Sequence, residues 1–260
     1  GLQLASSGLF SNVVLGCRDG GRGQHAAQQI TNELQKVESS LGCEVSYETL
    51  TIGDRHSHAS FCKKMQERFG KVDVLVNNAG TAFKGSDPTP FEGQCRPTLD
   101  VNFRGTCEFT EEMLPLVRRG KDPRIVNVAS MAGRLGQIRS KEIQRRFVDP
   151  NLSAKELYGL VDQFESDVMD GTYSAKGWGN SNYGMSKLAL IAMTRILARE
   201  EAENGIKVNS CCPGYCDTDM TSHRGSRSAS EGARNAVLPA TMEDVPTAEY
   251  FRDFEVAHWG

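Results

Sequence analysis

The sequence has few of the features that mark a membrane protein, a metalloprotein or a general nucleic-acid binder. Its 260 residues contain no run of about 18 apolar residues, which a membrane-spanning helix requires. The eight cysteines and five histidines form no Cys-x-x-Cys or His-x-x-x-His pair, so the short ligand spacing of a zinc site is absent and we expect no metal. Thirty basic side chains against 33 acidic ones give a net charge of -3, which provides no basic surface for nucleic acid.

A signal peptide is also not visible, so we expect reduced thiols in a cytoplasmic protein. Hydrophobic residues make up 38% of the chain and charged residues 24%, a balance that excludes a disordered protein. A chain of this length buries roughly 70–75% of its unfolded surface and needs no disulfide to hold a core. We expect a single domain over residues 1–260.

Short apolar runs alternate with segments of helical periodicity along most of the chain. Strands are expected at 13–17, 45–52, 72–76, 124–128 and 206–209. Helices are expected at 24–39, 59–69, 91–117 and 182–204. This alternation predicts an α/β fold, with a doubly wound parallel sheet and helices on both faces.

Residues 134–178 break this rhythm, because they contain no strand candidate. Seven basic and seven acidic residues fall in the segment, together with apolar residues at helical spacing such as Leu157, Leu160 and Phe164. We expect two or three surface helices that dock on the main domain as a helical insert, with the charges on a solvated face.

Tyr183 and Lys187 form the most informative pair, because residues at i and i+4 project from the same face of a helix. An ammonium beside a phenol stabilises the phenolate and lowers the tyrosine pKa from about 10. Such a tyrosine can donate a proton near neutral pH. Taken alone the pair is weak, since most Tyr-x-x-x-Lys matches are structural.

Three further features lie where a parallel sheet collects its ligands, at the carboxyl ends of strands. Ser130 follows the strand expected at 124–128, and Asn77-Asn78-Ala79-Gly80 closes the one at 72–76. Small residues there let a flat ligand approach the backbone. Asn102 lies inside an expected helix, where asparagine is a poor helix former, so its alternative role is a kink with local backbone bonding.

The ordered set Asn77-Asn78-Ala79-Gly80, Asn102, Ser130, Tyr183-x-x-x-Lys187 and Pro213-Gly214 resembles the short-chain dehydrogenase/reductase family, whose fold is Rossmann-like. Cys211-Cys212-Pro213-Gly214, Thr218-Asp219-Met220 and the 53 positions between Ser130 and Tyr183 are typical of its NADPH-dependent carbonyl reductase branch. In that branch the helical insert covers the helix face that other members use to dimerise. The resemblance therefore implies a monomer.

The resemblance also implies a role for each matching residue. Tyr183 is the expected general acid, Lys187 lowers its pKa and holds the nicotinamide ribose, Ser130 orients the carbonyl oxygen, and Asn102 positions a water. Met131 and Cys212 are expected at the substrate; the alternatives are packing for Met131 and an inert buried thiol for Cys212. The other expected cofactor-binding residues are Gly1, Asn77, Ala79, Gly80, Val101, Pro213, Gly214, Thr218 and Met220.

The choice of cofactor depends on charge at the end of the strand 13–17. Arg18 stands where an acidic residue would bind the ribose hydroxyls of NAD, and a guanidinium there suits the 2′-phosphate of NADPH. Arg22 is a possible second contact, and for both the alternative is an ordinary surface arginine. Two departures from the family pattern concern the same cofactor half. The Gly-rich phosphate loop and first strand should precede Leu2, with only Gly1 represented, and Thr51 replaces an adenine-binding Asp.

These features predict NADPH-dependent reduction of aldehydes, ketones or quinones, with a small-molecule carbonyl substrate as the partner. A non-catalytic nucleotide-binding or scaffold protein on the same fold is the first alternative. A sugar-nucleotide epimerase or dehydratase shares Tyr-x-x-x-Lys, but usually has a larger C-terminal substrate domain. Residues 221–260 match the family weakly and are expected to include the lid over the substrate.

Overall fold

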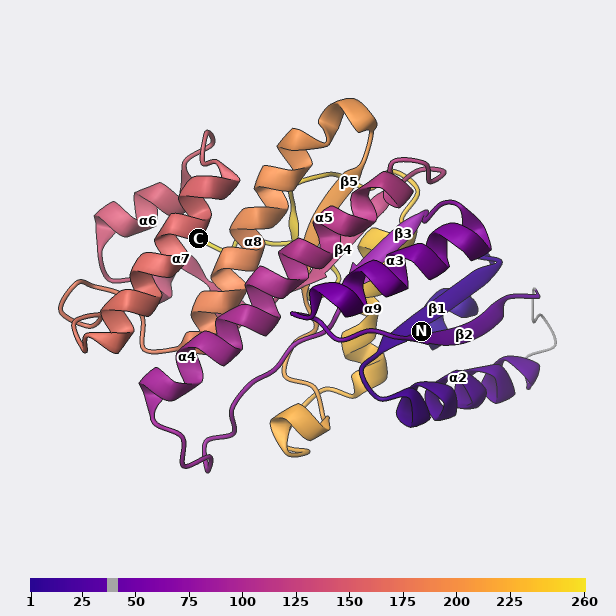
Figure 1. Cartoon of the computed structure of the whole chain (residues 1–260), viewed down its shortest axis with the longest axis horizontal. Coiled ribbons are helices and arrows are strands. Elements are labelled where there is room, and N and C mark those ends of the chain that lie inside the picture. The colour runs from indigo at the N-terminus through magenta and orange to yellow at the C-terminus, as the bar shows by residue number, and fades with distance from the viewer. Residues whose placement is uncertain (37–41) are drawn as a thin grey trace.

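The computed structural model describes residues 1–36 and 42–260 (Figure 1). Strands and helices alternate through most of the chain, as the sequence predicts. The elements are α1 (Leu2–Ala5), β1 (Asn12–Cys17), α2 (Gly20–Gln35), β2 (Glu44–Thr49), α3 (Arg55–Phe69), β3 (Val74–Asn77), α4 (Phe91–Leu99), α5 (Thr106–Val117), β4 (Arg124–Val128), α6 (Lys141–Val148), α7 (Ala154–Met169), α8 (Asn182–Glu200), β5 (Lys207–Cys212), α9 (Ala229–Thr241), β6 (Tyr250–Arg252) and β7 (Glu255–Val256).

The strands form two sheets that are parallel except at one edge. β3, β4, β5 and β6 pair in that order, and β7 adds an antiparallel edge to β6. β1 and β2 form a separate parallel pair. The predicted parallel α/β architecture is confirmed, with the difference that the described strands do not join into one continuous sheet.

Helices cover both faces of the sheets (Figure 1). α3, α5 and α8 lie on one face, where Ile125 of β4 packs among their apolar side chains. α1 and α9 lie on the other face against Val126 and Val128, and α2 packs with α1 on β1. All five residues of β4 are buried, and its apolar residues Ile125, Val126 and Val128 therefore face both sides of the sheet rather than alternating with exposed ones.

Two helices begin earlier than their apolar periodicity indicates, because each is capped by an aspartate. α2 begins at Gly20, where the Asp19 carboxylate accepts a hydrogen bond from the Arg22 amide. α3 begins at Arg55, where Asp54 accepts from the amides of His56 and Ser57. Such caps satisfy amides that have no partner inside the helix. The last residues of the helix predicted at 24–39 lie outside the described residues.

The helix predicted at 91–117 is interrupted by a π-helical turn, η1 (Asp100–Gly105). Asn102 and Phe103 lie at its centre and are fully buried. The turn follows Pro97, which lies inside α4 and cannot donate a backbone hydrogen bond. π-turns of this kind widen a helix locally and occur often at functional sites.

The helical insert of residues 134–178 contains α6 and α7. α7 lies against α4 and α8 and buries Leu157, Leu160, Val161 and Phe164 completely (Figure 1). Ser153 begins α7 with a reciprocal pair of hydrogen bonds to Glu156. The insert is therefore docked through an apolar helix face onto the main domain.

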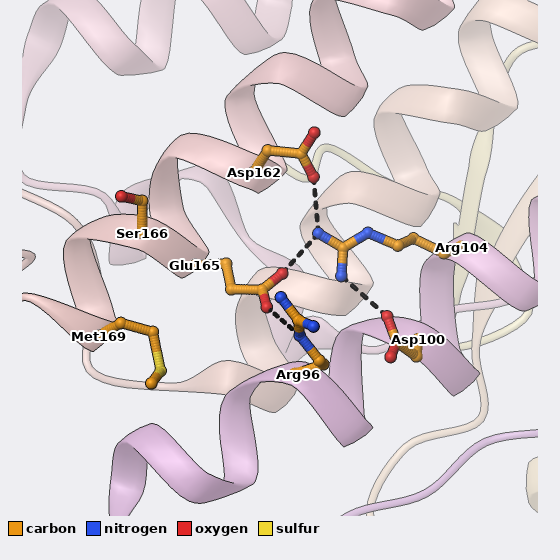
Figure 2. Close-up of a pocket in the computed structure, with 7 residues that line it drawn as sticks. All are labelled: Arg96, Asp100, Arg104, Asp162, Glu165, Ser166 and Met169. Carbon is orange, nitrogen blue, oxygen red and sulfur yellow. Dashed lines mark hydrogen bonds and ion pairs between the residues drawn. The ribbon is translucent and has the colours of Figure 1, made fainter.

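Glu165 on this insert is buried, and for this residue the expectation of a solvated face was wrong (Figure 2). Glu165 accepts from Arg96 Nε at 2.6 Å and from Arg104 Nη2 at 2.7 Å. Arg104 also donates to Asp162 at 2.6 Å and to Asp100 at 2.9 Å. The carboxylates of α7 thus bind arginines of α4 and η1, and the buried Glu165 depends on them because a buried charge needs a partner.

The described residues, 1–36 and 42–260, include no helix with the length and hydropathy needed to cross a bilayer. In the same part of the chain, no three His, Cys, Asp or Glu side chains gather closely enough to hold a metal ion. The eight cysteines, all of which are described, are free thiols.

Candidate active site

A cavity of about 1780 Å³ runs from the facing edges of β1 and β3 to the carboxyl ends of β4 and β5. It brings together segments that are far apart in the sequence. The predicted site residues that line it are Gly1, Asn77, Ala79, Gly80, Ser130, Met131, Tyr183, Lys187, Cys212, Pro213, Gly214, Thr218 and Met220. At the carboxyl ends of the strands the lining combines apolar and polar residues, as the site of an extended ligand does.

Two glycines bring Ser130 beside Tyr183. Ser130 begins a short 3-10 turn, η2 (Met131–Gly133), which lies against the start of α8. A Cβ atom on Gly133 would lie 2.7 Å from the Lys187 carbonyl carbon, and one on Gly184 would lie 2.8 Å from the Ala132 carbonyl oxygen. Only residues without a side chain allow this approach. Our sequence analysis missed both glycines, although Gly184 stands inside the Tyr183–Lys187 motif.

Burial dominates the protonation of Tyr183. It raises the pKa of the phenol, and a hydrogen bond with Ser130 opposes this rise. Lys187 is not among the groups that shift this pKa in the chain alone, so its expected effect on Tyr183 stays a prediction. The Lys187 ammonium lies 5.7 Å from the centre of the Tyr183 ring and donates instead to the Val128 carbonyl at 2.8 Å. Burial also lowers the pKa of Lys187 to about 8.

Asn102 holds one wall of the cavity in place. Its Nδ2 donates to the Thr81 carbonyl at 2.9 Å and to Ser186 Oγ at 3.0 Å, and its Oδ1 accepts from the Thr81 amide at 2.7 Å. Ser186 in turn donates to the Tyr183 carbonyl at 2.8 Å. The side chain of Asn102 thus links η1, the segment after Gly80, and α8. Ser186 is a site residue that the sequence analysis missed.

Asn77 directs its side chain into the core, although the residue borders the cavity. Its Nδ2 donates to Thr110 Oγ1 and to Asn127 Oδ1, both at 2.8 Å. Asn127 in turn donates to Thr194 Oγ1 at 2.9 Å. This chain of four buried polar side chains, the Asn77–Asn127 network, links α5, β3, β4 and α8. The geometry gives the Asn77 amide a structural role.

Four of the predicted residues do not line the cavity: Arg18, Arg22, Val101 and Asn102. Arg18 directly follows β1, whose residues border the cavity, and Arg22 lies in the first turn of α2. Both arginines are exposed and form no ion pair within the described part of the chain.

Met131 and Cys212 differ in how they face the cavity. Met131 is 53% exposed, so it is not a core residue. Cys212 is 1% exposed, and its sulfur accepts from the amides of Met131 and Gly214 at 3.2 and 3.3 Å. The thiol therefore ties the turn after Ser130 to the Pro213-Gly214 loop.

Comparisons with known proteins agree with this geometry. The sequence profile of the short chain dehydrogenase family matches residues 5–141, and that of enoyl-(acyl carrier protein) reductase matches residues 168–250. Carbonyl reductase [NADPH] 1 of Homo sapiens is 37% identical over 261 residues, which cover 96% of this chain and 90% of the human protein. The chain belongs to the short-chain dehydrogenase family. The resemblance inferred from the sequence is therefore confirmed.

Solved structures of short-chain dehydrogenase type share the whole fold. Salutaridine reductase from Papaver somniferum superposes with a TM-score of 0.84 at 27% identity, over 97% of this chain and 94% of that one. Menthone neomenthol reductase from Mentha piperita gives 0.75 at 26% identity, over 96% and 91%. Both matches span the main domain and the helical insert.

Proposed function

We propose that this short-chain dehydrogenase is an NADPH-dependent carbonyl reductase that converts aldehydes, ketones or quinones to alcohols. The observation that carries the proposal is that Ser130, Tyr183 and Lys187 line one cavity together with the Pro213-Gly214 loop. The similarity to carbonyl reductases of the NADPH type supports the same reaction.

The donors around the cavity fit a phosphorylated dinucleotide. Lys187 has three N–H donors, and within the described residues only the Val128 carbonyl takes one, so two remain for ribose hydroxyls. Arg18 and Arg22 stand at the far end, where a 2′-phosphate would bind a guanidinium. Leu15, Gly16 and Cys17, which precede Arg18 on β1, line the cavity together with Lys187. NADPH is therefore the cofactor that we assign.

Each polar group has a distinct part in this mechanism. When bound, the reduced nicotinamide supplies the hydride that adds to the carbonyl carbon. Ser130 donates a hydrogen bond that orients the carbonyl oxygen, and Tyr183 transfers its phenolic proton to that oxygen. Its raised pKa keeps the phenol protonated at neutral pH. Lys187 stabilises the phenolate that remains.

Asn102 acts next to this proton donor. Both N–H groups of its amide are engaged, while Oδ1 accepts only from the Thr81 amide within the described residues. A carbonyl oxygen has two lone pairs, so one is left for the water that returns a proton to Tyr183. The same amide holds Thr81 and therefore its neighbour Gly80. Gly80 lies close to Lys187, since a Cβ on it would be 3.5 Å from the Lys187 Nζ.

Replacement of Tyr183 tests the proposed reaction. We expect Tyr183→Phe to lower kcat/KM for a carbonyl substrate by about 10²–10⁴-fold, because the proton donor is lost. The Kd for NADPH, measured by fluorescence titration, should change little. Tyr173→Phe is the matched control, since Tyr173 lies in the insert, packs on Phe91 of α4 and does not line the cavity.

Two results would contradict the proposal. Unchanged turnover by Tyr183→Phe would remove the tyrosine from the mechanism. A folded protein that binds NADPH but does not oxidise it with any of a broad set of carbonyl compounds would favour the nucleotide-binding alternative.

A further inference from the structure

Arg227 lies outside the cavity lining but fastens the loop that forms one of its walls. Its Nη1 donates to the Pro213 carbonyl at 3.2 Å. The guanidinium also lies against Gly214, since a Cβ on that glycine would approach Nη1 to 2.7 Å. Gly214 has a φ of +85°, in the region that favours glycine. The guanidinium thus supports the loop at the point where its backbone takes a conformation that favours glycine.

The backbone of Arg227 holds the next residues of the same loop. Its amide donates to the Tyr215 carbonyl at 3.1 Å, and its carbonyl accepts from the Asp217 amide at 2.8 Å. These bonds form an isolated parallel bridge with Cys216. Arg227 therefore fixes the loop from Pro213 to Asp217 through side chain and main chain together.

The second guanidinium contact connects this loop to the end of the sheet. Nη2 of Arg227 donates to Asp253 Oδ1 at 2.7 Å, in the turn between β6 and β7. That turn is itself anchored, because the fully buried Asn235 of α9 accepts from the Phe254 amide at 2.9 Å. Asp253 and Phe254 have φ values of +55° and +70°, so the turn has a defined shape. The loop is thereby tied to a fixed point of the fold.

We propose that Arg227 is a positioning residue for the nicotinamide half of the cofactor, acting through Pro213 and Gly214. The inference rests on the proposed function: the hydride must reach a carbonyl beside Ser130 and Tyr183, and the Pro213-Gly214 loop lines the cavity with them and is joined to the turn after Ser130 through Cys212. Arg18 and Arg227 act on different halves of the cofactor. Arg18 recognises the phosphorylated adenosine half directly, and Arg227 prepares the surface for the other half.

Two ligands distinguish this role from a general structural one. NADPH contains both halves of the cofactor, whereas 2′,5′-ADP contains only the phosphorylated adenosine half. For Arg227→Met we expect a Kd for NADPH about tenfold higher, on the order of one lost hydrogen bond to a charged group. The Kd for 2′,5′-ADP should remain within about twofold. Arg18→Met should weaken both ligands.

Matched variants complete the experiment. Arg227 and Arg234 both lie over the Phe254 ring, but Arg234 has no hydrogen bond to the loop in the described structure. In Arg234→Met both Kd values should therefore stay unchanged. Asp253→Asn, at an exposed side chain, keeps Arg227 and weakens its anchor, and should raise the NADPH Kd in the same direction by a smaller factor. This variant decides the question if Arg227→Met does not fold.

Parallel losses of both ligands in Arg227→Met, or no change in either, would overturn the positioning role while leaving the proposed function intact. If the unmodified protein bound neither ligand, the proposed function would fail and this inference with it.

Discussion

The Lys187 side chain is 4% exposed, and burial lowers the pKa of its ammonium from 10.5 to about 8. Between these two pH values the unfolded chain holds this proton more tightly than the folded protein does. The contribution of Lys187 to the free energy of unfolding therefore increases as the pH rises from about 8 to 10.5. At neutral pH the folded protein carries a charge whose burial costs about 3 kcal/mol, from 1.4 kcal/mol per pKa unit.

We predict that Lys187→Met stabilises the fold and removes the activity. Near pH 7 its free energy of unfolding should exceed that of the unmodified protein by about 1–3 kcal/mol, because the buried ammonium is gone. The excess should shrink as pH rises from 8 toward 10.5. Chemical denaturation at several pH values measures it, with the exposed Lys155→Met as control. A difference that does not vary with pH would contradict the burial argument.

At the scale of elements, α7 is held by apolar contacts and by the ion pairs of Glu165 (Figure 2). The Glu165 side chain is 9% exposed, whereas Asp162, which binds the same nitrogen of Arg104, is 63% exposed. A carboxylate removed from solvent depends on its partners more than an exposed one does. The two residues therefore offer a matched pair of substitutions on one helix.

We predict that Glu165→Gln lowers the free energy of unfolding by about 1–3 kcal/mol, because Arg104 and Arg96 lose their shared carboxylate. Asp162→Asn should cost less than about 1 kcal/mol, as expected for an exposed ion pair. Urea denaturation measures both. The pKa of Glu165 lies below its ordinary value, so its contribution should disappear as pH falls through that lowered pKa. Equal losses in the two variants would contradict the assignment.

The elements that sequence patterns predicted are those with a strong local signal. β1 contains the apolar run Val13-Val14-Leu15, and β4 contains Ile125-Val126 and Val128. β6 and β7 were missed because they have only three and two residues and exist through pairing, β6 with β5 and β7 with β6. The motif residues Ser130, Tyr183 and Lys187 were found from their spacing. Arg227 and Ser186 were not, because they act through contacts with segments distant in sequence.

At the scale of the whole molecule, the helical insert covers a surface that would otherwise be open. α7 lies over α4 and α8, and its Leu157 and Leu160 are completely buried there. A second copy of the chain cannot use this helix face while α7 occupies it. This face of α4 and α8 is therefore covered by the chain itself.

We predict that the protein is a monomer in solution, with the mass of one chain by light scattering. The mass should not change on dilution, because no subunit contact at α4 and α8 is available to dissociate. A mass of twice this value would show that another surface associates, or that α7 leaves its position.

The Asn77–Asn127 network has a consequence for how the chain finds its topology. Asn77 and Asn127 are direct partners in the β3–β4 ladder, and their side chains connect to Thr110 and Thr194 on two helices. A slip of one residue would turn these amides to the opposite side and separate them from both threonines. Each polar group left alone in the apolar interior would cost about 1–3 kcal/mol. The four side chains thus favour the native register of β3 and β4. They raise the free energy of mispaired intermediates during folding more than they lower the free energy of the finished protein.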